Sequence, residues 1–132
     1  MDRKALLFAA LLCVALAGPG LITHAQAMQT ISNEQLMSRI DKGTAPLILD
    51  VRSPREFADG HVPGAINIPH TALADRLKEL TQHKGQDVAV YCEAGVRAAV
   101  AGEILENSGF ENVLHLEGDM RAWRSKRLPQ EQ

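Results

Sequence analysis

From residue 28 onward, short apolar runs alternate with longer segments in which apolar residues recur at a helical spacing. The apolar runs predict strands over 28–31, 47–51, 65–68, 88–91 and 113–116, and the spaced segments predict helices after Ser32 and Ser53 and over 71–80, 96–107 and 120–123. Uninterrupted apolar strands separated by helices are typical of a parallel sheet that helices cover on both faces. We therefore expect an α/β domain whose functional groups lie at the carboxyl ends of its strands.

The predicted helices carry local signals for where they begin and which face they bury. Ser32 with Gln35, and Ser53 with Glu56, have the spacing of capping boxes. In the segment 71–80 the apolar positions are Leu73, Leu77 and Leu80. In the segment 96–107 they are Val96, Ala99, Val100 and Ile104. We expect each of these two apolar sets to face the core.

The first 27 residues have a different pattern. Arg3 and Lys4 precede an apolar stretch over 5–18, and the triplet Ala25-Gln26-Ala27 follows it. This order is typical of a secretory signal peptide, and the apolar stretch is shorter than the roughly 20 residues needed to cross a bilayer. We expect residues 1–27 to be a cleaved signal peptide and residues 28–132 to form one periplasmic domain without a membrane attachment. An uncleaved membrane anchor is the alternative.

Charge and cysteine content narrow the classes of function. The formal net charge is −2, and no basic run or aromatic cluster indicates nucleic-acid binding. Of the two cysteines, Cys13 lies in the predicted signal peptide and Cys92 in the predicted domain. Exported domains use cysteines in pairs, and a single one cannot form an internal disulfide. Cys92 is therefore either an inert core thiol or a reactive one.

The sequence around Cys92 favours the reactive alternative. Cys92 follows the predicted strand 88–91 directly, Gly95 precedes the next predicted helix, and Arg97 lies in the first turn of that helix. N–H groups of such a loop and the positive end of the helix stabilise an anion, and Arg97 can fork onto an anionic substrate. The candidate substrate-binding residues are Glu93, Ala94, Gly95, Val96 and Arg97.

Two long segments resemble the signature of the rhodanese family. Cys-x-x-Gly-x-Arg over 92–97 resembles the active-site loop of that family. The residues 50–57, DVRSPREF, and 60–69, GHVPGAINIP, resemble its D-x-R…E-[FY]-x-x-G-H-[IV]-x-G-A-x-N-[IV]-P signature. The resemblance covers essentially all of 28–132, and the short exported form is similar to the phage-shock type of periplasmic rhodanese.

The resemblance implies a rhodanese-like, five-stranded parallel sheet flanked by helices on both faces. It also implies a sulfurtransferase in which the Cys92 thiolate takes sulfane sulfur from a small donor such as thiosulfate and holds it as a persulfide. A thiophilic acceptor such as cyanide or a thiol then removes the sulfur. A protein sulfur acceptor is a further candidate partner. The resemblance implies neither a metal nor an organic cofactor.

The chain departs from the family pattern at three places. Ala98 stands where many relatives have serine, and Glu93 places a negative charge beside the sulfur, which opposes a dianionic donor. Glu117-Gly118-Asp119 stands where relatives often have paired glycines. Asp50 and Arg52 are expected to support the site structurally, by pairing with each other or with loop N–H groups.

Other classes of function remain as alternatives. A cysteine phosphatase or arsenate reductase would have five residues between its cysteine and arginine, whereas four separate Cys92 from Arg97. A sulfur carrier or a binding module without turnover is the second alternative. His70, His83 and His115 lack metal-ligand spacing. His61 is expected to pack the loop that contains it, and Trp123 is expected in the core.

Overall fold

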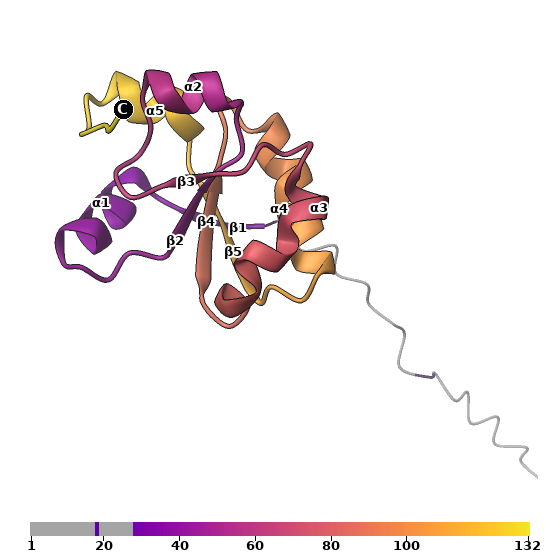
Figure 1. Cartoon of the computed structure of the whole chain (residues 1–132). Coiled ribbons are helices and arrows are strands. Elements are labelled where there is room, and N and C mark those ends of the chain that lie inside the picture. The colour runs from indigo at the N-terminus through magenta and orange to yellow at the C-terminus, as the bar shows by residue number, and fades with distance from the viewer. Residues whose placement is uncertain (1–17, 19–27) are drawn as a thin grey trace, which may run out of the picture.

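A five-stranded parallel sheet forms the centre of the protein (Figure 1). The computed structural model describes Gly18 and residues 28–132. The strand order is β1-β5-β4-β2-β3, and all four strand pairs are parallel. The strands are β1 (Gln29–Ile31), β2 (Leu47–Asp50), β3 (Ile66–Asn67), β4 (Asp87–Tyr91) and β5 (Asn112–Leu116). The predicted five-stranded α/β fold is confirmed.

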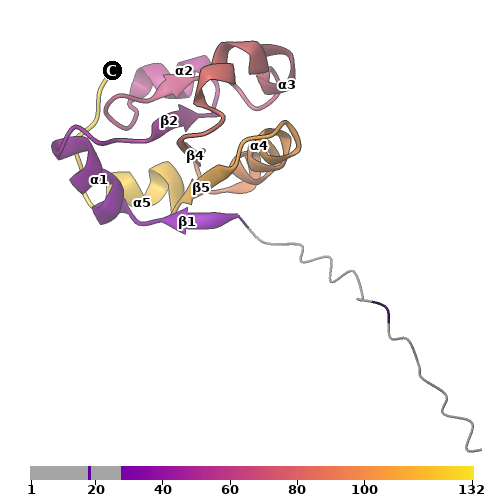
Figure 2. The ribbon, with the colours of Figure 1, turned by 90° about the horizontal axis from the view of Figure 1, so that it is seen from below.

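Helices cover both faces of the sheet, as Figure 2 shows from below. The helices are α1 (Asn33–Asp41), α2 (Pro54–Asp59), α3 (Leu73–Arg76), the 3-10 helix η1 (Leu77–His83), α4 (Val96–Asn107) and α5 (Asp119–Ser125). One core lies between the sheet and α3, η1 and α4, and contains Leu73, Leu80 and Leu105. The other lies between the sheet and α1 and α5, and contains Leu36 and Trp123. Both strand faces are therefore buried, which is why the central strands are continuously apolar.

Two of the helices begin with the predicted capping boxes. Ser32 Oγ accepts from Gln35 N at 3.0 Å, and Gln35 Oε1 accepts from Ser32 N at 2.9 Å. In the same way, Ser53 Oγ accepts from Glu56 N at 3.2 Å, and the Glu56 carboxylate accepts from Ser53 N at 2.9 Å. These bonds satisfy backbone donors that the first helical turn leaves free. They fix α2 directly after β2, near the carboxyl end of the sheet.

The segment predicted as one helix over 71–80 is a short α-helix followed by a 3-10 helix. α3 begins after Ala72, whose side chain cannot cap it, and the chain tightens into η1 after Arg76. Leu73 and Leu80 are nevertheless buried, and Leu77 packs against the same core. The apolar spacing therefore predicted the buried face correctly, but not the change of helical pitch.

The prediction of the buried face of α4 was wrong for Val96, Ala99 and Val100, which are exposed, whereas Ile104 packs against the core as predicted. Val96 and Val100 are 79% and 46% exposed. The fully buried face is formed by Ala98, Ala101, Gly102 and Leu105. Small residues let the helix backbone lie close to the sheet, where Val113 is the facing residue of β5. Because α4 is apolar on nearly every side, apolar spacing alone could not select this face.

The predicted signal peptide lies outside the described residues, apart from Gly18. Cys13 lies in the same part of the chain. Within the described part, no helix combines the length and the apolar character that crossing a bilayer requires.

Candidate active site

Cys92 leaves the carboxyl end of β4 and begins a tight loop that leads into α4. Its side chain is buried, with 1% of the residue exposed. Gly95 N–H donates to Cys92 Sγ at 3.0 Å. Gly95 has a φ of 114°, in the left-handed region that favours glycine. The loop therefore turns back far enough to direct a backbone donor at the sulfur, and it can do so because residue 95 has no Cβ.

The amino end of α4 begins at the residue after the Gly95 donor. Gly95 is the N-cap of this helix, and no side chain within 28–132 caps it. The first N–H groups of a helix have no partner inside the helix, and they carry the positive end of its dipole. The loop and the start of α4 together form a place where an anionic sulfur is stabilised by backbone groups.

Arg97 does not present a free guanidinium to this loop. Its Nη1 and Nη2 donate to the two carboxylate oxygens of Glu56 at 2.7 and 2.9 Å. The hydrogen bond from Arg97 lowers the pKa of Glu56 to about 2, and the same bond raises the pKa of Arg97. The fork expected to bind an anionic substrate is occupied by a carboxylate of α2, because the α2 capping box holds Glu56 close to the amino end of α4.

Glu93 is also paired. Its carboxylate accepts from Nη2 of Arg124, on α5, and lies 3.8 Å from Nη1 of Arg52. The Glu93 side chain is 30% exposed. Two guanidinium groups therefore compensate the negative charge expected beside the sulfur. Arg124 is paired with Glu93 itself, and Arg52 is paired mainly with Asp50.

Asp50 and Arg52 form a buried pair at the carboxyl end of β2. Arg52 Nη2 donates to Asp50 Oδ2 at 2.7 Å and to the carbonyl of Gly60 at 2.8 Å. Arg52 N donates to Asp50 Oδ1 at 2.9 Å. The guanidinium also lies over the ring of Tyr91, 5.7 Å from its centroid. The pair thus joins the end of β2 to the end of β4 and to the loop after α2.

Asp119 and His115 contact the Cys92 loop from β5 and α5, and the sequence interpretation gave neither a role. Asp119 Oδ1 accepts from Cys92 N at 2.9 Å, and His115 Nε2 lies 2.9 Å from both Asp119 oxygens. The available signal was the departure of Glu117-Gly118-Asp119 from the paired glycines that relatives often have. That departure showed that residue 119 differs from the family pattern, but not what its side chain contacts.

Comparison with known proteins shows which family the chain is similar to. The family model described as "Rhodanese-like domain" matches residues 32–126 of this chain. The chain belongs to the rhodanese family. A sulfurtransferase of Allochromatium vinosum is 34% identical over 99 residues, which cover 75% of this chain and 91% of that protein. A putative sulfur carrier protein of Bacillus subtilis is 29% identical over 103 residues, covering 78% of this chain and 55% of that protein.

The solved structures agree with the fold as well. The crystal structure of a rhodanese-related protein of Thermoplasma volcanium matches this rhodanese with a TM-score of 0.69 and 32% identity, covering 78% of this chain and 97% of that one. This rhodanese spans about half the length of several other curated relatives that it matches. What the remaining parts of those relatives do is therefore no guide to its partners.

His61 and Trp123, the two residues with predicted packing roles, are held by ring stacking, burial and hydrogen bonds. His61 stacks on Phe57 with ring centroids 3.6 Å apart, and its Nδ1 lies 2.8 Å from the Phe57 carbonyl. The backbone of His61 exchanges two hydrogen bonds with Glu131. Trp123 is fully buried, and its Nε1 donates to the Pro129 carbonyl at 2.8 Å. The packing roles predicted for His61 and Trp123 are confirmed.

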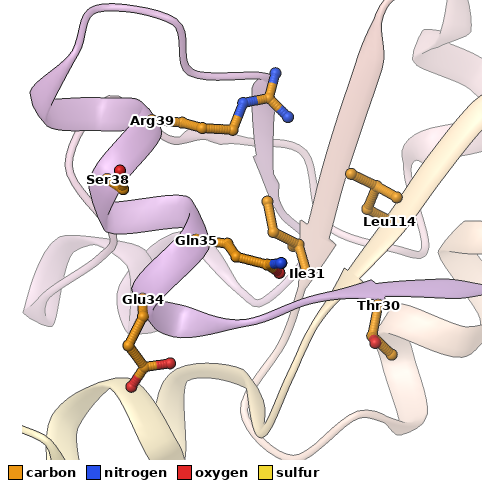
Figure 3. Close-up of a pocket in the computed structure, with 7 residues that line it drawn as sticks. All are labelled: Thr30, Ile31, Glu34, Gln35, Ser38, Arg39 and Leu114. Carbon is orange, nitrogen blue, oxygen red and sulfur yellow. The ribbon is translucent and has the colours of Figure 1, made fainter.

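Two hollows in the rhodanese domain differ in their relation to the cysteine. A cleft of about 270 Å³ adjoins the Cys92 loop and is lined by Arg52, Glu56, Asp59, Gly60, Glu93, Arg124 and Gln130. A hollow of about 560 Å³ lies between α1 and the β1–β5 side of the sheet (Figure 3). Its charged residues Glu34 and Arg39 are bound to Lys126 and Asp87. The smaller cleft is the one adjacent to the candidate chemistry.

Proposed function

We propose that this rhodanese is a sulfurtransferase that carries sulfane sulfur as a persulfide on Cys92. The observation that carries the proposal is the donation of Gly95 N–H to Cys92 Sγ at the start of a helix that no described side chain caps. Backbone donors held in this way favour a thiolate and then the terminal sulfur of a persulfide. The relationship to a sulfurtransferase of Allochromatium vinosum supports the same reaction class.

Each half-reaction transfers one sulfur atom without a net oxidant. The Cys92 thiolate attacks the outer sulfur of a donor such as thiosulfate, a new S–S bond forms, and the old S–S bond breaks with its electron pair leaving on sulfite. A nucleophile such as cyanide or a thiol then attacks the terminal sulfur of the persulfide. Its bond to that sulfur forms, the S–S bond to Cys92 breaks, and the thiolate is restored.

The charges around the cleft favour donors other than small dianions. Arg97 is paired with Glu56, Arg124 with Glu93, and Arg52 with Asp50. A dianion such as thiosulfate must compete with these carboxylates for the guanidinium groups, whereas a neutral or protein-borne sulfane sulfur does not. We therefore assign thiosulfate and cyanide the role of assay substrates and expect the physiological sulfur to arrive on a thiol carrier.

A sulfur carrier without rapid turnover is the second candidate. The relationship to a putative sulfur carrier protein of Bacillus subtilis favours it. Both candidates require a persulfide on Cys92, and they differ in whether an acceptor removes the sulfur repeatedly. Multiple turnovers of thiocyanate per protein molecule indicate the enzyme, and a single equivalent indicates the carrier.

Substitution of the thiol tests the role of Cys92. Cys92→Ser should abolish thiocyanate formation with the fold retained, because a serine hydroxyl cannot form a persulfide. Glu117→Gln, at an exposed position, is the control and should react at the rate of the parent. Thiocyanate formation by Cys92→Ser at the parent rate would refute the proposed nucleophile.

We further propose that residues 1–27 direct export to the periplasm and are removed there. The basic start, the apolar stretch and the Ala25-Gln26-Ala27 triplet support this. Amino-terminal sequencing of the protein recovered from the periplasm should begin at Met28. Recovery of exported protein that retains residues 5–18 would contradict cleavage and favour an anchor.

A further inference from the structure

Asp119 places a buried carboxylate directly behind the sulfur-bearing residue. It is 2% exposed, and its Oδ1 accepts the backbone N–H of Cys92 at 2.9 Å. Nε2 of His115 lies 2.9 Å from each Asp119 oxygen and donates to the carboxylate. Both carboxylate oxygens are therefore engaged, one by the cysteine backbone and the imidazole together and the other by the imidazole.

The start of α5 is joined to the same loop by its backbone. Met120 N donates to the Cys92 carbonyl at 3.0 Å, and Arg121 N donates to the Glu93 carbonyl at 3.2 Å. With the Asp119 bond, these contacts hold both the N–H and the carbonyl of Cys92. The loop that bears the sulfur is thus fixed from α5 at its first two residues.

The opposite end of the loop packs on the same two side chains. A Cβ built on Gly95 would lie 3.2 Å from Asp119 Oδ2 and 3.5 Å from His115 Cε1. Gly95 is the residue that donates to Cys92 Sγ. Asp119 therefore bonds the loop at Cys92, and Asp119 and His115 both lie close to Gly95, the residue that directs a donor at the sulfur.

The backbone of Asp119 indicates that its side chain is held in place by these contacts. Its φ is 55°, in the left-handed region that is unfavourable for a residue with a Cβ. Strain of this kind persists where surrounding contacts determine the conformation. Glycine would relieve the strain at residue 119, but it would remove both the acceptor for Cys92 and the partner of His115.

The charges of the pair compensate each other. The hydrogen bond to Asp119 raises the pKa of His115, so the imidazolium persists to higher pH than in a free histidine. The other charges that surround the loop are Arg97 with Glu56 and Glu93 with Arg124 and Arg52. The charge of His115 therefore changes as pH rises through its raised pKa, above the ordinary histidine value of about 6.5.

We propose that Asp119 and His115 are positioning residues for Cys92, in which the carboxylate holds the cysteine N–H and the imidazolium holds and neutralises the carboxylate. The inference rests on the proposed function of Cys92 for its role in sulfur transfer. Below the pKa of His115 the pair has no net charge. Above that pKa, the carboxylate remains negative beside the loop and opposes an anionic donor.

Three variants of the full chain separate positioning from general stability. Asp119→Gly removes the acceptor while relieving the left-handed strain, and Asp119→Asn keeps an acceptor oxygen for Cys92 N–H. His115→Gln retains a donor for Asp119 but carries no charge at any pH. Glu117→Gln is the control, since Glu117 is exposed and carries the same charge two residues before Asp119.

The readout is the rate at which Cys92 gains one sulfur atom from thiosulfate, followed by intact mass. We expect Asp119→Gly to load sulfur on the order of tenfold more slowly, because a hydrogen bond to a charged group is lost. Asp119→Asn should lie between this variant and the parent, and Glu117→Gln should match the parent. Loading of folded Asp119→Gly at the parent rate would overturn the proposal.

The pH dependence of sulfur loading distinguishes charge compensation from a merely structural role of His115. The ratio of the parent rate to the His115→Gln rate should exceed one at low pH and fall toward one as pH rises through the His115 pKa, measured by NMR titration. A ratio independent of pH would contradict the proposed charge compensation. If Asp119→Gly does not fold, this ratio decides the question alone.

A second reagent distinguishes failure of this proposal from failure of the proposed function. If the parent gains no sulfur from any donor, the proposed function is wrong. Alkylation of Cys92 by neutral iodoacetamide at fixed pH still reports how the loop holds the thiol. Slower alkylation of Asp119→Gly than of Glu117→Gln would then support the positioning role, and equal rates would refute it.

Discussion

The guanidinium of Arg97, in the first turn after the Cys92 loop, is bound through two hydrogen bonds to the carboxylate of Glu56 on α2, at 2.7 and 2.9 Å. Glu56 also completes the capping box with Ser53. One carboxylate thus fixes the start of α2 and occupies the fork nearest the sulfur. The substrate preference of the site therefore depends on a residue of the helix after β2 as well as on the loop itself.

Glu56→Gln should release Arg97 while leaving α2 capped, since Gln35 makes the same capping box in α1. We expect the Michaelis constant for thiosulfate to fall about two- to fivefold at low salt, the range of a partly exposed ion pair. In an Arg97→Ala background the same change should have no effect. A gain that persists without Arg97 would show that Glu56 acts on the donor directly.

The same pair predicts a pH dependence of stability. The pKa of Glu56 is lowered from 4.5 to about 2 in the folded protein. The pair therefore stabilises the fold fully above pH 4.5, and its contribution is lost as pH falls toward about 2. The difference in free energy of unfolding between the parent and Glu56→Gln should be constant above that window and shrink within it. A difference that does not change with acidification would contradict the shift.

Glu93→Gln should improve the use of thiosulfate by a comparable factor, roughly two- to fivefold, because it frees Arg124 to attract the dianion, while Arg52 stays paired with Asp50. The gain should shrink as salt is raised. Glutamine is the better test than lysine, since a lysine at this position would lie between two guanidinium groups. Glu103→Gln, on the exposed side of α4, is the control for net charge. An equal gain in that control would show that net charge, and not the position of Glu93, limits the use of thiosulfate.

Arg52→Met should destabilise the fold by about 3–5 kcal/mol, because it leaves the buried carboxylate of Asp50 without its charge partner. Arg39→Met is the matched control: Arg39 pairs with Asp87 at the same kind of distance, but both side chains are about one-third exposed. That change should cost no more than about 1 kcal/mol. Urea unfolding followed by the fluorescence of Trp123 measures both. Equal costs would mean that Asp50 finds other compensation.

The sequence was sufficient to predict the layers and the position of Cys92 directly after a strand. Strand burial on both faces makes continuous apolar runs, and the parallel order that follows places Cys92 at a strand end. The capping boxes at Ser32 and Ser53 could be predicted because their bonds join residues three positions apart. The pairing of Asp50 with Arg52 is local in the same sense.

Contacts between distant segments could not be predicted in this way. The bonds of Arg97 to Glu56, of Arg124 to Glu93 and of Asp119 to Cys92 each join different elements of the fold. Each partner alone has the properties of an ordinary exposed or loop residue. The outward face of α4 is a related case, since Val96 is exposed because the Gly95 turn sets the direction from which the helix approaches the sheet.

The most direct test of the central claim is the intact mass of the purified protein before and after incubation with a sulfur donor. We predict that the parent gains one sulfur atom, that cyanide removes it, and that Cys92→Ser gains none while the exposed-site control Glu117→Gln behaves as the parent. Absence of any mass gain in folded parent protein, with thiosulfate and with a persulfide donor, would contradict the claim that Cys92 carries sulfur.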